Sequence, residues 1–274
     1  MTSTNELELP RALAVETFDL VRSFGGVNAV DHINLRIDRG SFFGFLGPNG
    51  AGKSTTIKML TGLLGPTSGK IRVLDRDIEA EPLEVKRRIG VVPEDLNLFE
   101  RLTGAEMLVF TGRMYGLGKS EIVERVPELL SLMELQDEPK KLIVEYSHGM
   151  KKKLSLACAL IHRPEILFLD EPFEGVDAIA SRTLKDLLTR LTTRGLTVFL
   201  TSHVLEIVER LCSDIAIIAQ GKLLAAGPLQ ELRKGIAVNG DSVAAGPMSL
   251  EDYFIRVVGG ERSAGEAEVL RWLT

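Results

Sequence analysis

The sequence predicts an α/β fold with a mostly parallel sheet and a helical segment inserted into it. Short apolar runs alternate with helical stretches in the first and last parts of the chain, which is the pattern of a parallel sheet covered by helices on both faces. The middle part instead repeats its apolar residues at spacings of three and four, which indicates helices. No convincing strand interrupts that part, so we expect a helical insertion between two halves of the core.

Composition limits the class of protein further. The chain has 274 residues, of which 45% are hydrophobic and 26% are charged, and its net charge is −5. These values argue against disorder and against a domain that binds nucleic acid with its whole surface. No uncharged apolar run approaches the roughly 18–20 residues of a membrane span, and the N-terminus lacks the features of a secretory signal. We expect a soluble intracellular protein in which Cys158 and Cys212 are buried, reduced thiols.

The N-terminal part predicts strands that flank turns. Residues 1–10 are polar and end in a proline, as in a loose tail. Apolar and polar residues partly alternate over 14–21 and again over 33–37, which predicts two half-buried strands. The elements expected next are an apolar strand, a glycine-rich loop, a helix and a further strand, over 42–46, 47–54, 55–64 and 69–74.

The remaining segments continue this alternation and end in an extension. After the helical spacing of 96–160, the expected strands are 166–169, 197–200 and 215–218, and the expected helices are 181–191 and 204–211. A linker of small residues over 235–246 leads to a helix from Ser249 to Val257 and a last helix over 264–272. We therefore divide the chain into a tail (1–10), a discontinuous α/β core (11–93 and 161–232), a helical subdomain (94–160) and a linker with a C-terminal helical extension (233–274).

A phosphate-binding loop lies between the strand expected over 42–46 and the helix that follows it. Its residues fit the pattern G-x-x-x-x-G-K-[ST] in the required strand–loop–helix context. The glycines allow a tight backbone whose N–H groups encircle a phosphate. Lys53 supplies a point charge for the outer phosphates, and Ser54 supplies a hydroxyl for Mg²⁺. The alternative is a chance glycine loop. The nucleotide-binding residues expected here are Gly47, Pro48, Asn49, Gly50, Ala51, Gly52, Lys53, Ser54 and Thr55.

Two acidic residues follow the strand expected over 166–169. A carboxylate at the carboxyl end of a parallel strand points into the crevice where ligands of such sheets bind. Asp170 would hold Mg²⁺ through its water shell, and Glu171 would polarise the water that attacks the terminal phosphate. The alternative is that the pair only caps the next helix. Together with the phosphate loop, the pair predicts nucleotide hydrolysis.

Three further motifs give the sequence a family resemblance. Tyr146-Ser147-His148-Gly149-Met150 precedes a lysine-rich helix, and Gly175-Val176-Asp177 and Thr201-Ser202-His203 follow the acidic pair. In this order the motifs resemble those of the nucleotide-binding subunit of ATP-binding cassette (ABC) transporters, over about residues 11–232. The resemblance implies a P-loop NTPase fold of the ABC type with an antiparallel β region at its N-terminus. It also implies an ATPase that uses ATP and Mg²⁺.

The resemblance further implies that two chains cooperate. In this family two cassettes enclose two ATP molecules, each held between the phosphate loop of one chain and the signature motif of the other. Ser147 and Gly149 would contact the γ-phosphate bound by the partner chain, and Asp177 would signal between the two sites. The signature differs from the usual Leu-Ser-Gly-Gly-Gln at its first, third and fifth residues. The third, His148, would either donate to phosphate or face solvent.

Three other positions take roles from the same resemblance. Glu94 stands where the family usually has a magnesium-contacting Gln and remains an oxygen ligand, or it is an acid at a helix start. Phe24 matches the aromatic ring that stacks on adenine, or it is a core residue at a strand end. His203 matches the histidine that contacts the γ-phosphate and orients the attacking water. The lysine run at 151–153 is expected to be a solvated helix face rather than a nucleic-acid site.

The function expected from the resemblance is ATP hydrolysis that powers a membrane transporter of the export type. The partners would be a second cassette, identical or paralogous, and a separate integral membrane permease, without nucleic acid. The chain would then lie at the cytoplasmic face of the inner (cell) membrane, held there by the permease. The alternative is a soluble ABC ATPase in assembly or repair, which the absence of a long coiled-coil arm in the helical insertion disfavours.

Overall fold

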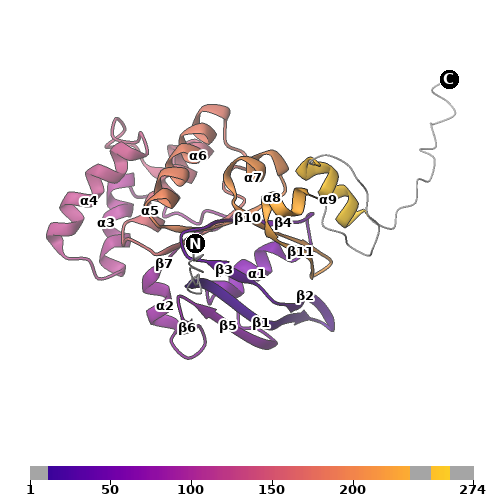
Figure 1. Ribbon diagram of the computed structural model, residues 1–274. Helices are drawn as coiled ribbons and strands as arrows, with labels where there is room; N and C mark the ends of the chain where they lie inside the picture. Colours follow the sequence, from indigo (N-terminus) through magenta and orange to yellow (C-terminus); the bar gives the residue numbers. More distant parts are fainter. Residues whose placement is uncertain (1–11, 235–247, 260–274) are drawn as a thin grey trace, which may run out of the picture.

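The computed structural model describes residues 12–234 and 248–259. Within these residues it has two sheets, with helices packed between them and over the outer face of the larger one (Figure 1). The larger sheet is parallel from β10 to β7, and only its edge strand β11 is antiparallel. This confirms the predicted mostly parallel sheet. Its strands in spatial order are β11 (Lys222–Pro228), β10 (Asp214–Ala219), β4 (Phe42–Leu46), β9 (Thr197–Ser202), β8 (Ile166–Asp170) and β7 (Ile89–Val92).

The second sheet is the antiparallel region expected near the N-terminus. The single strand expected over 33–37 is wrong, because β2 ends at Ile33 and β3 begins at Arg36. Thr17 of β1 fills this break: its hydroxyl donates to the Ile33 carbonyl (2.9 Å) and accepts from the Leu35 N–H (2.8 Å). The strands of this sheet are β1 (Leu13–Phe24), β2 (Val27–Ile33), β3 (Arg36–Asp38), β5 (Ser68–Val73) and β6 (Arg76–Asp77).

Helix α1 (Lys53–Leu60) lies between the two sheets and begins directly after the glycine-rich loop. Its apolar residues are buried in a cluster that takes side chains from both sheets. The helix expected over 55–64 ends earlier, because Gly62 has a φ of 66° and a left-handed residue terminates a helix. Burial on both sides fixes the N-terminus of α1, and therefore fixes the end of the loop that precedes it.

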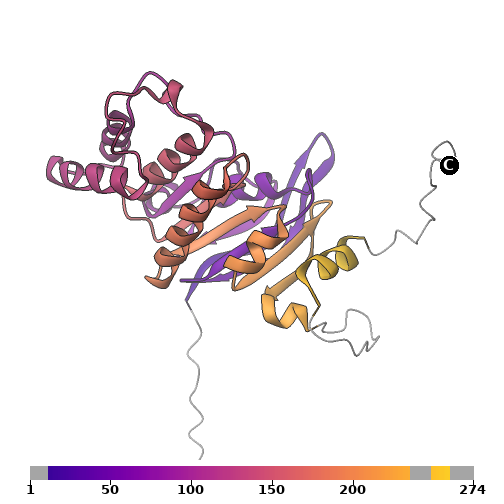
Figure 2. The same ribbon diagram turned by 90° about the horizontal axis from the view of Figure 1, so that it is seen from above.

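The segment between β7 and β8 is helical, as predicted. It contains α3 (Gly104–Met114), α4 (Lys119–Leu132) and α5 (His148–Leu160), with a short 3-10 helix at Ile143–Glu145. Helices α3 and α4 extend beyond the sheet at one end of the molecule (Figure 2). Helix α5 packs against β7, where a Cβ at Gly90 would lie 2.4 Å from the carbonyl oxygen of Ala159. This close backbone contact joins the insertion to the core.

The remaining helices cover the outer face of the parallel sheet and its β11 edge. The helix expected from Ser249 is confirmed, because the Ser249 hydroxyl accepts from the N–H of Asp252 (3.1 Å). The expected linker 235–246 and last helix 264–272, like the tail 1–10, lie outside the described residues. None of the described helices is both long and apolar enough to cross a bilayer. The helices over the outer face and the β11 edge are α6 (Ala178–Thr193), α7 (Leu205–Leu211), α8 (Leu229–Arg233) and α9 (Leu250–Val258). Helix α2 (Pro82–Arg88) lies before β7.

Candidate active site

The phosphate loop follows β4, whose residues are all buried, and two of its glycines have no room for a side chain. A Cβ at Gly47 would lie 2.3 Å from the carbonyl oxygen of Ile218 in β10, and a Cβ at Gly52 would lie 2.4 Å from that of Ala29 in β2. Gly52 also has a φ of 109°, which residues with a Cβ rarely adopt. The loop is therefore fixed between strands of both sheets.

Lys53 begins α1, and its buried ammonium group turns back over the loop. Its Nζ donates to the carbonyl oxygens of Gly47 (2.8 Å) and Pro48 (3.4 Å). The same Nζ lies 3.4 Å from Oε1 of Glu171. A buried ammonium group needs such partners, because taking an unpaired charge out of water is costly. The lysine therefore joins the phosphate loop to the acidic end of β8.

A cavity of about 300 Å³ opens beside the loop. Its volume is at the lower end of the roughly 300–1,000 Å³ typical of ligand pockets. Segments that are far apart in the sequence meet there, as the carboxyl ends of parallel strands do at a ligand crevice. The predicted site residues that line it are Asn49, Gly50, Ala51, Gly52, Lys53, Ser54, Thr55, Glu94, Glu171 and His203, and Ala29 and Glu174 also line it.

Asp170 and Glu171 occupy different layers of this site. Asp170 is the last residue of β8 and is buried, and its Oδ1 accepts a 2.6 Å hydrogen bond from the hydroxyl of Thr201. Glu171 has a φ of 46° and lines the cavity, and its N–H donates to the same hydroxyl oxygen (3.0 Å). The alternative that this pair caps the next helix is wrong, because the side chain of Asp177 caps α6.

The Glu171 carboxylate is buried, and one of its oxygens lacks a hydrogen bond. Oε2 lies 3.1 Å from Nδ1 of His203, which follows β9. Oε1 lies near the Lys53 ammonium but accepts no hydrogen bond from the described residues. Buried polar atoms are rarely left unpaired. An oxygen in this position can take a proton from a water molecule in the cavity.

Glu94 lines the cavity just beyond β7. Burial raises its pKa above the ordinary value, and the nearby charges of Asp170 and Glu174 raise it further. Glu94 does not start a helix, since α3 begins only at Gly104, so that alternative is wrong. A divalent cation would offset the repulsion among these carboxylates.

The oxygen donors around the cavity fit Mg²⁺. Within the described residues no group of three or more His, Cys, Asp or Glu side chains could hold a metal alone. Mg²⁺ does not need such a cage, because it keeps several waters and binds through one or two carboxylates together with substrate phosphates. Ser54 and Glu94 line the cavity, and Asp170 directly precedes Glu171, which also lines it.

The signature motif does not line the phosphate-loop cavity of its own chain. Ser147 caps α5 by accepting from the N–H of Met150 (3.2 Å). Gly149 is buried, and a Cβ added there would lie 3.6 Å from Oδ2 of Asp177. Asp177 in turn caps α6, and the hydrogen bonds that its carboxylate accepts from backbone N–H groups lower its pKa. The motif therefore presents a helix N-terminus, which favours anions, away from its own phosphate loop.

The sequence left two alternative environments each for Phe24 and His148, and the structure shows where both side chains lie. Phe24 ends β1 with 49% of its surface exposed, so the alternative of a core residue is wrong. The guanidinium carbon of Arg22 lies 4.6 Å from the centre of its ring. His148 is exposed and packs on the loop before α6, where a Cβ at Gly175 would lie 3.0 Å from its ring. Neither residue lines the cavity.

The expected solvated face at 151–153 is wrong for two of its three lysines. Lys152 and Lys153 are buried, whereas Lys151 is half-buried and pairs with Glu100 (2.8 Å). Sequence reasoning also missed Thr201 as a site residue. Its place at the end of a buried strand, two residues before His203, was the signal that could have identified it.

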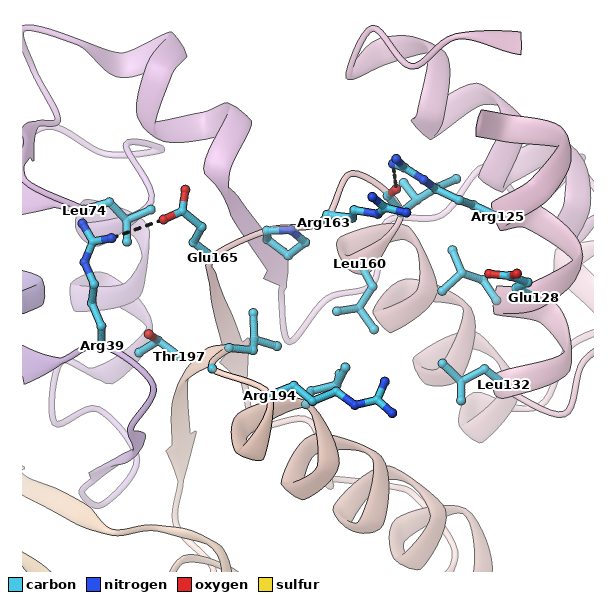
Figure 3. Close-up of a pocket in the computed structure, with 16 residues that line it drawn as sticks. Arg39, Leu74, Arg125, Glu128, Leu132, Leu160, Arg163, Glu165, Arg194 and Thr197 are labelled. Atoms are coloured by element: carbon cyan, nitrogen blue, oxygen red, sulfur yellow. Dashed lines mark hydrogen bonds and ion pairs between the residues drawn. The ribbon is translucent and has the colours of Figure 1, made fainter. Parts of the chain in front are cut away.

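A second cavity, of about 700 Å³, lies away from the phosphate loop, at the amino ends of β8 and β9 and beside α4 (Figure 3). Figure 3 shows the ion pair of Arg39 and Glu165 on one side and Arg125 of α4 on the other. None of the predicted site residues lines this cavity. Its size alone does not make it a nucleotide site.

Comparison with known proteins agrees with this geometry. The ABC transporter family model matches residues 30–174. The bacitracin transport ATP-binding protein BcrA of Bacillus licheniformis is 40% identical over 221 residues, which cover 80% of this chain and 71% of that protein. The daunorubicin/doxorubicin resistance ATP-binding protein DrrA of Streptomyces peucetius is 40% identical over 226 residues, covering 82% of this chain and 68% of that protein.

Solved structures give the same assignment. The structure of an ATP-binding subunit of an ABC transporter superposes with a TM-score of 0.80 at 30% identity, covering 89% of this chain and 99% of that one. A dimeric ATP-binding cassette in a post-hydrolysis state, bound to ADP and Pi, superposes with a TM-score of 0.70 at 26% identity, covering 78% of this chain and 98% of that one. The predicted P-loop NTPase fold of the ABC type is thereby confirmed. The chain belongs to the ABC transporter family, as an ATP-binding and ATP-hydrolysing subunit of the export type.

Proposed function

We propose that ATP is hydrolysed at the phosphate-loop cavity with Glu171 as the general base. The observation that supports this role is the buried Oε1 of Glu171, which lies 3.4 Å from the Lys53 ammonium group but accepts no hydrogen bond from the described residues. The carboxylate would take a proton from the water whose oxygen attacks the γ-phosphorus. His203, held on the other carboxylate oxygen, would contact the γ-phosphate and orient that water.

The other predicted residues would hold the nucleotide and its metal. Residues 47–55 would bind the phosphates through backbone N–H groups, and phosphate oxygens would replace the carbonyl partners of Lys53. Ser54 and Glu94 would hold Mg²⁺ directly, and Asp170 would hold it through water. When bound, the ion neutralises charge on the phosphates. Phe24, with its exposed ring, would stack on adenine.

Lys53→Ala should weaken ATP binding by the isolated chain about tenfold or more, because a hydrogen bond to a charged group contributes roughly 1.5–3 kcal/mol. Titration with a fluorescent ATP analogue measures the dissociation constant directly. Lys58→Ala is the matched control, since Lys58 lies on the same helix but is exposed. Equal affinity in the two variants would exclude Lys53 from the phosphate site.

We further propose that two cassettes, identical or paralogous, enclose two ATP molecules head to tail. Ser147 and Gly149 lie outside the cavity of their own chain, and this favours a role at the γ-phosphate bound by the partner chain. Asp177 would meet the opposite site, since it adjoins both the signature helix and the segment after Glu171. In this arrangement the discontinuous core 11–93 and 161–232 binds nucleotide, and the helical subdomain 94–160 completes the opposite site.

The transport partner that we propose is a separate integral membrane permease that exports its cargo. The chain would then lie at the cytoplasmic face of the cell membrane and be held there through the permease. An exposed apolar surface beyond Glu94 supports docking. Phe99 and Phe110 form an edge-to-face pair with ring centres 5.1 Å apart, and both rings are exposed. Contiguous apolar surface that stays exposed is a mark of an interaction site.

Phe99→Ser combined with Phe110→Ser should reduce co-purification of a neighbouring-gene, six-span permease at least about fivefold, since buried aromatic side chains dominate interface energies. The measurement is the ratio of permease to tagged chain after gentle detergent extraction. Val123→Ser is the control, because Val123 is an exposed apolar residue of the same subdomain on α4. Basal ATP hydrolysis should be retained in all these variants. An unchanged permease ratio would exclude this surface from docking.

A further inference from the structure

Lys152 lies in the helix that the signature motif begins, yet it contacts the catalytic segment of its own chain. Its side chain is only 3% exposed. Its Nζ donates a 2.7 Å hydrogen bond to the main-chain carbonyl oxygen of Glu171. Lysine is rarely buried to this degree without a specific partner. The hydrogen bond therefore links α5 directly to the residue that we propose as the general base.

The charges around Lys152 are those of the active site. Burial lowers the pKa of its ammonium group, and the carboxylates that oppose this shift are those of Glu174, Glu94, Glu171 and Asp170. The neighbouring lysines face other groups: Lys151 pairs with Glu100, and Lys153 pairs with Glu134. Of the three consecutive lysines, Lys152 is the one whose ammonium group contacts a residue that lines the nucleotide cavity.

Two more contacts join the signature helix to the segment 171–177. The His148 ring packs on Gly175, and Gly149 packs beside the Asp177 carboxylate, as the 3.0 and 3.6 Å distances from added Cβ atoms show. Together with the hydrogen bond from Lys152, these contacts join the first turns of α5 to both ends of this segment.

The backbone of Glu171 is held from two sides. Its N–H donates to the hydroxyl oxygen of Thr201 in β9 (3.0 Å), and its carbonyl accepts from Lys152 in α5. Its φ of 46° is unusual for a residue with a side chain and needs support from its surroundings. The same carbonyl also accepts from the N–H of Glu174 (3.2 Å), within the segment that follows β8. Of the two supports that come from other elements, one belongs to the parallel sheet and the other to the helical subdomain. A displacement of α5 would therefore act on the Glu171 carbonyl.

We propose that Lys152 is a positioning residue that transmits the placement of the signature helix to the Glu171 carboxylate of the same chain. The proposal rests on the proposed roles of Glu171 as general base and of the signature motif at the opposite site. When α5 moves toward nucleotide held by the partner chain, Lys152 moves with the helix. Its hydrogen bond then repositions the Glu171 carbonyl and thereby the Glu171 side chain. Occupancy of one site then raises the rate of hydrolysis at the other, without being strictly required for it.

Lys152→Met tests this role, because it removes the ammonium group and keeps an unbranched side chain. We expect kcat to fall about tenfold or more, since a misplacement of about 1 Å can cost a hundredfold in rate. KM and the ATP affinity of the isolated chain should change less than about twofold, because the phosphate loop is untouched. Lys152→Arg, which keeps charge and donors, should recover most of kcat. Lys153→Met is the matched control, since Lys153 is buried on the same helix but pairs with Glu134.

A double-variant cycle separates this proposal from the one on which it rests. If Glu171→Gln hydrolyses ATP at the wild-type rate, Glu171 is not the general base, whatever the Lys152 variants show. If Glu171→Gln is inactive as proposed, adding Lys152→Met should leave its residual rate unchanged, because Lys152 acts through Glu171. A further tenfold loss in that background would overturn the positioning role. So would equal kcat values for Lys152→Met and Lys153→Met, or a failure of Lys152→Arg to restore kcat while its Tm matches that of the wild type.

Discussion

Glu171→Gln is expected to stop steady ATP hydrolysis while leaving ATP binding intact. Glutamine keeps the size and shape of the side chain but cannot take a proton from water, and a general base contributes about 10²–10⁴-fold to a rate. The phosphate loop and Lys53 remain in place. The variant should therefore bind ATP and accumulate as an ATP-bound dimer. Phosphate release measures the loss of turnover, and size-exclusion chromatography with ATP measures the dimer.

The matched control for this prediction is Glu174→Gln. Glu174 also lines the cavity and carries the same charge, but it is exposed and lies three residues further along the chain. Its replacement should leave turnover within a few-fold of the wild type, because no observed contact joins it to His203 or Lys53. Wild-type turnover in Glu171→Gln, or equal losses in both variants, would show that Glu171 is not the catalytic carboxylate.

Gly149→Asp is expected to spare ATP binding by the isolated chain but to abolish the ATP-driven dimer. The structure has room for the Cβ itself, since its nearest neighbours would lie 3.6 and 3.7 Å away. The carboxylate is the problem, because it would face the γ-phosphate of the opposite site and also lie near Asp177. Like charges repel strongly where water is excluded. Turnover should fall about a hundredfold or more, as when one donor to a transition-state anion is lost.

Two smaller changes at the same position separate charge from size. Gly149→Ala should fold normally and keep part of the activity, since its Cβ makes ordinary contacts. Gly149→Asn has the shape of the aspartate without its charge and should retain more dimer than Gly149→Asp. If all three variants lose dimer equally, the signature acts through shape alone, and the like-charge explanation is wrong.

Mixing Gly149→Asp with Lys53→Ala chains tests whether the signature acts on the opposite site. In a dimer that contains one chain of each variant, both substitutions fall at one composite site and the other site is intact. Activity should therefore recover above that of either variant alone. No recovery, with mixed dimers shown to form, would count against two independent composite sites, or would show that the two sites are strictly coupled.

The chemistry of the nucleotide site could be predicted from the sequence because its main parts are local. The phosphate loop is one contiguous run, and the strand before it and the helix after it follow from patterns within a few residues of it. The pair Asp170 and Glu171 also follows directly on an apolar strand. Such motifs carry their structural context with them. The family resemblance then assigned roles at the site to Ser147, Asp177 and His203.

Element boundaries and short elements could not be predicted in the same way. The break between β2 and β3 depends on the hydroxyl of Thr17, which lies on a different strand. β7 and β11 are short segments that sequence reasoning missed, and in the structure they pair with β8 and β10. The strand propensity of a short segment is decided by the neighbours against which it packs.

The sequence by itself determined the α/β class, the phosphate loop and the carboxylates that follow β8. Only the tertiary structure decided which polar side chains are buried and what they contact. A run of three lysines looks solvated in the sequence, yet the packing of α5 against its neighbours buries Lys152 and Lys153. The hydrogen bond from Lys152 to Glu171 spans 19 positions. Desolvation depends on the packing of whole elements, and a local sequence pattern does not contain that information.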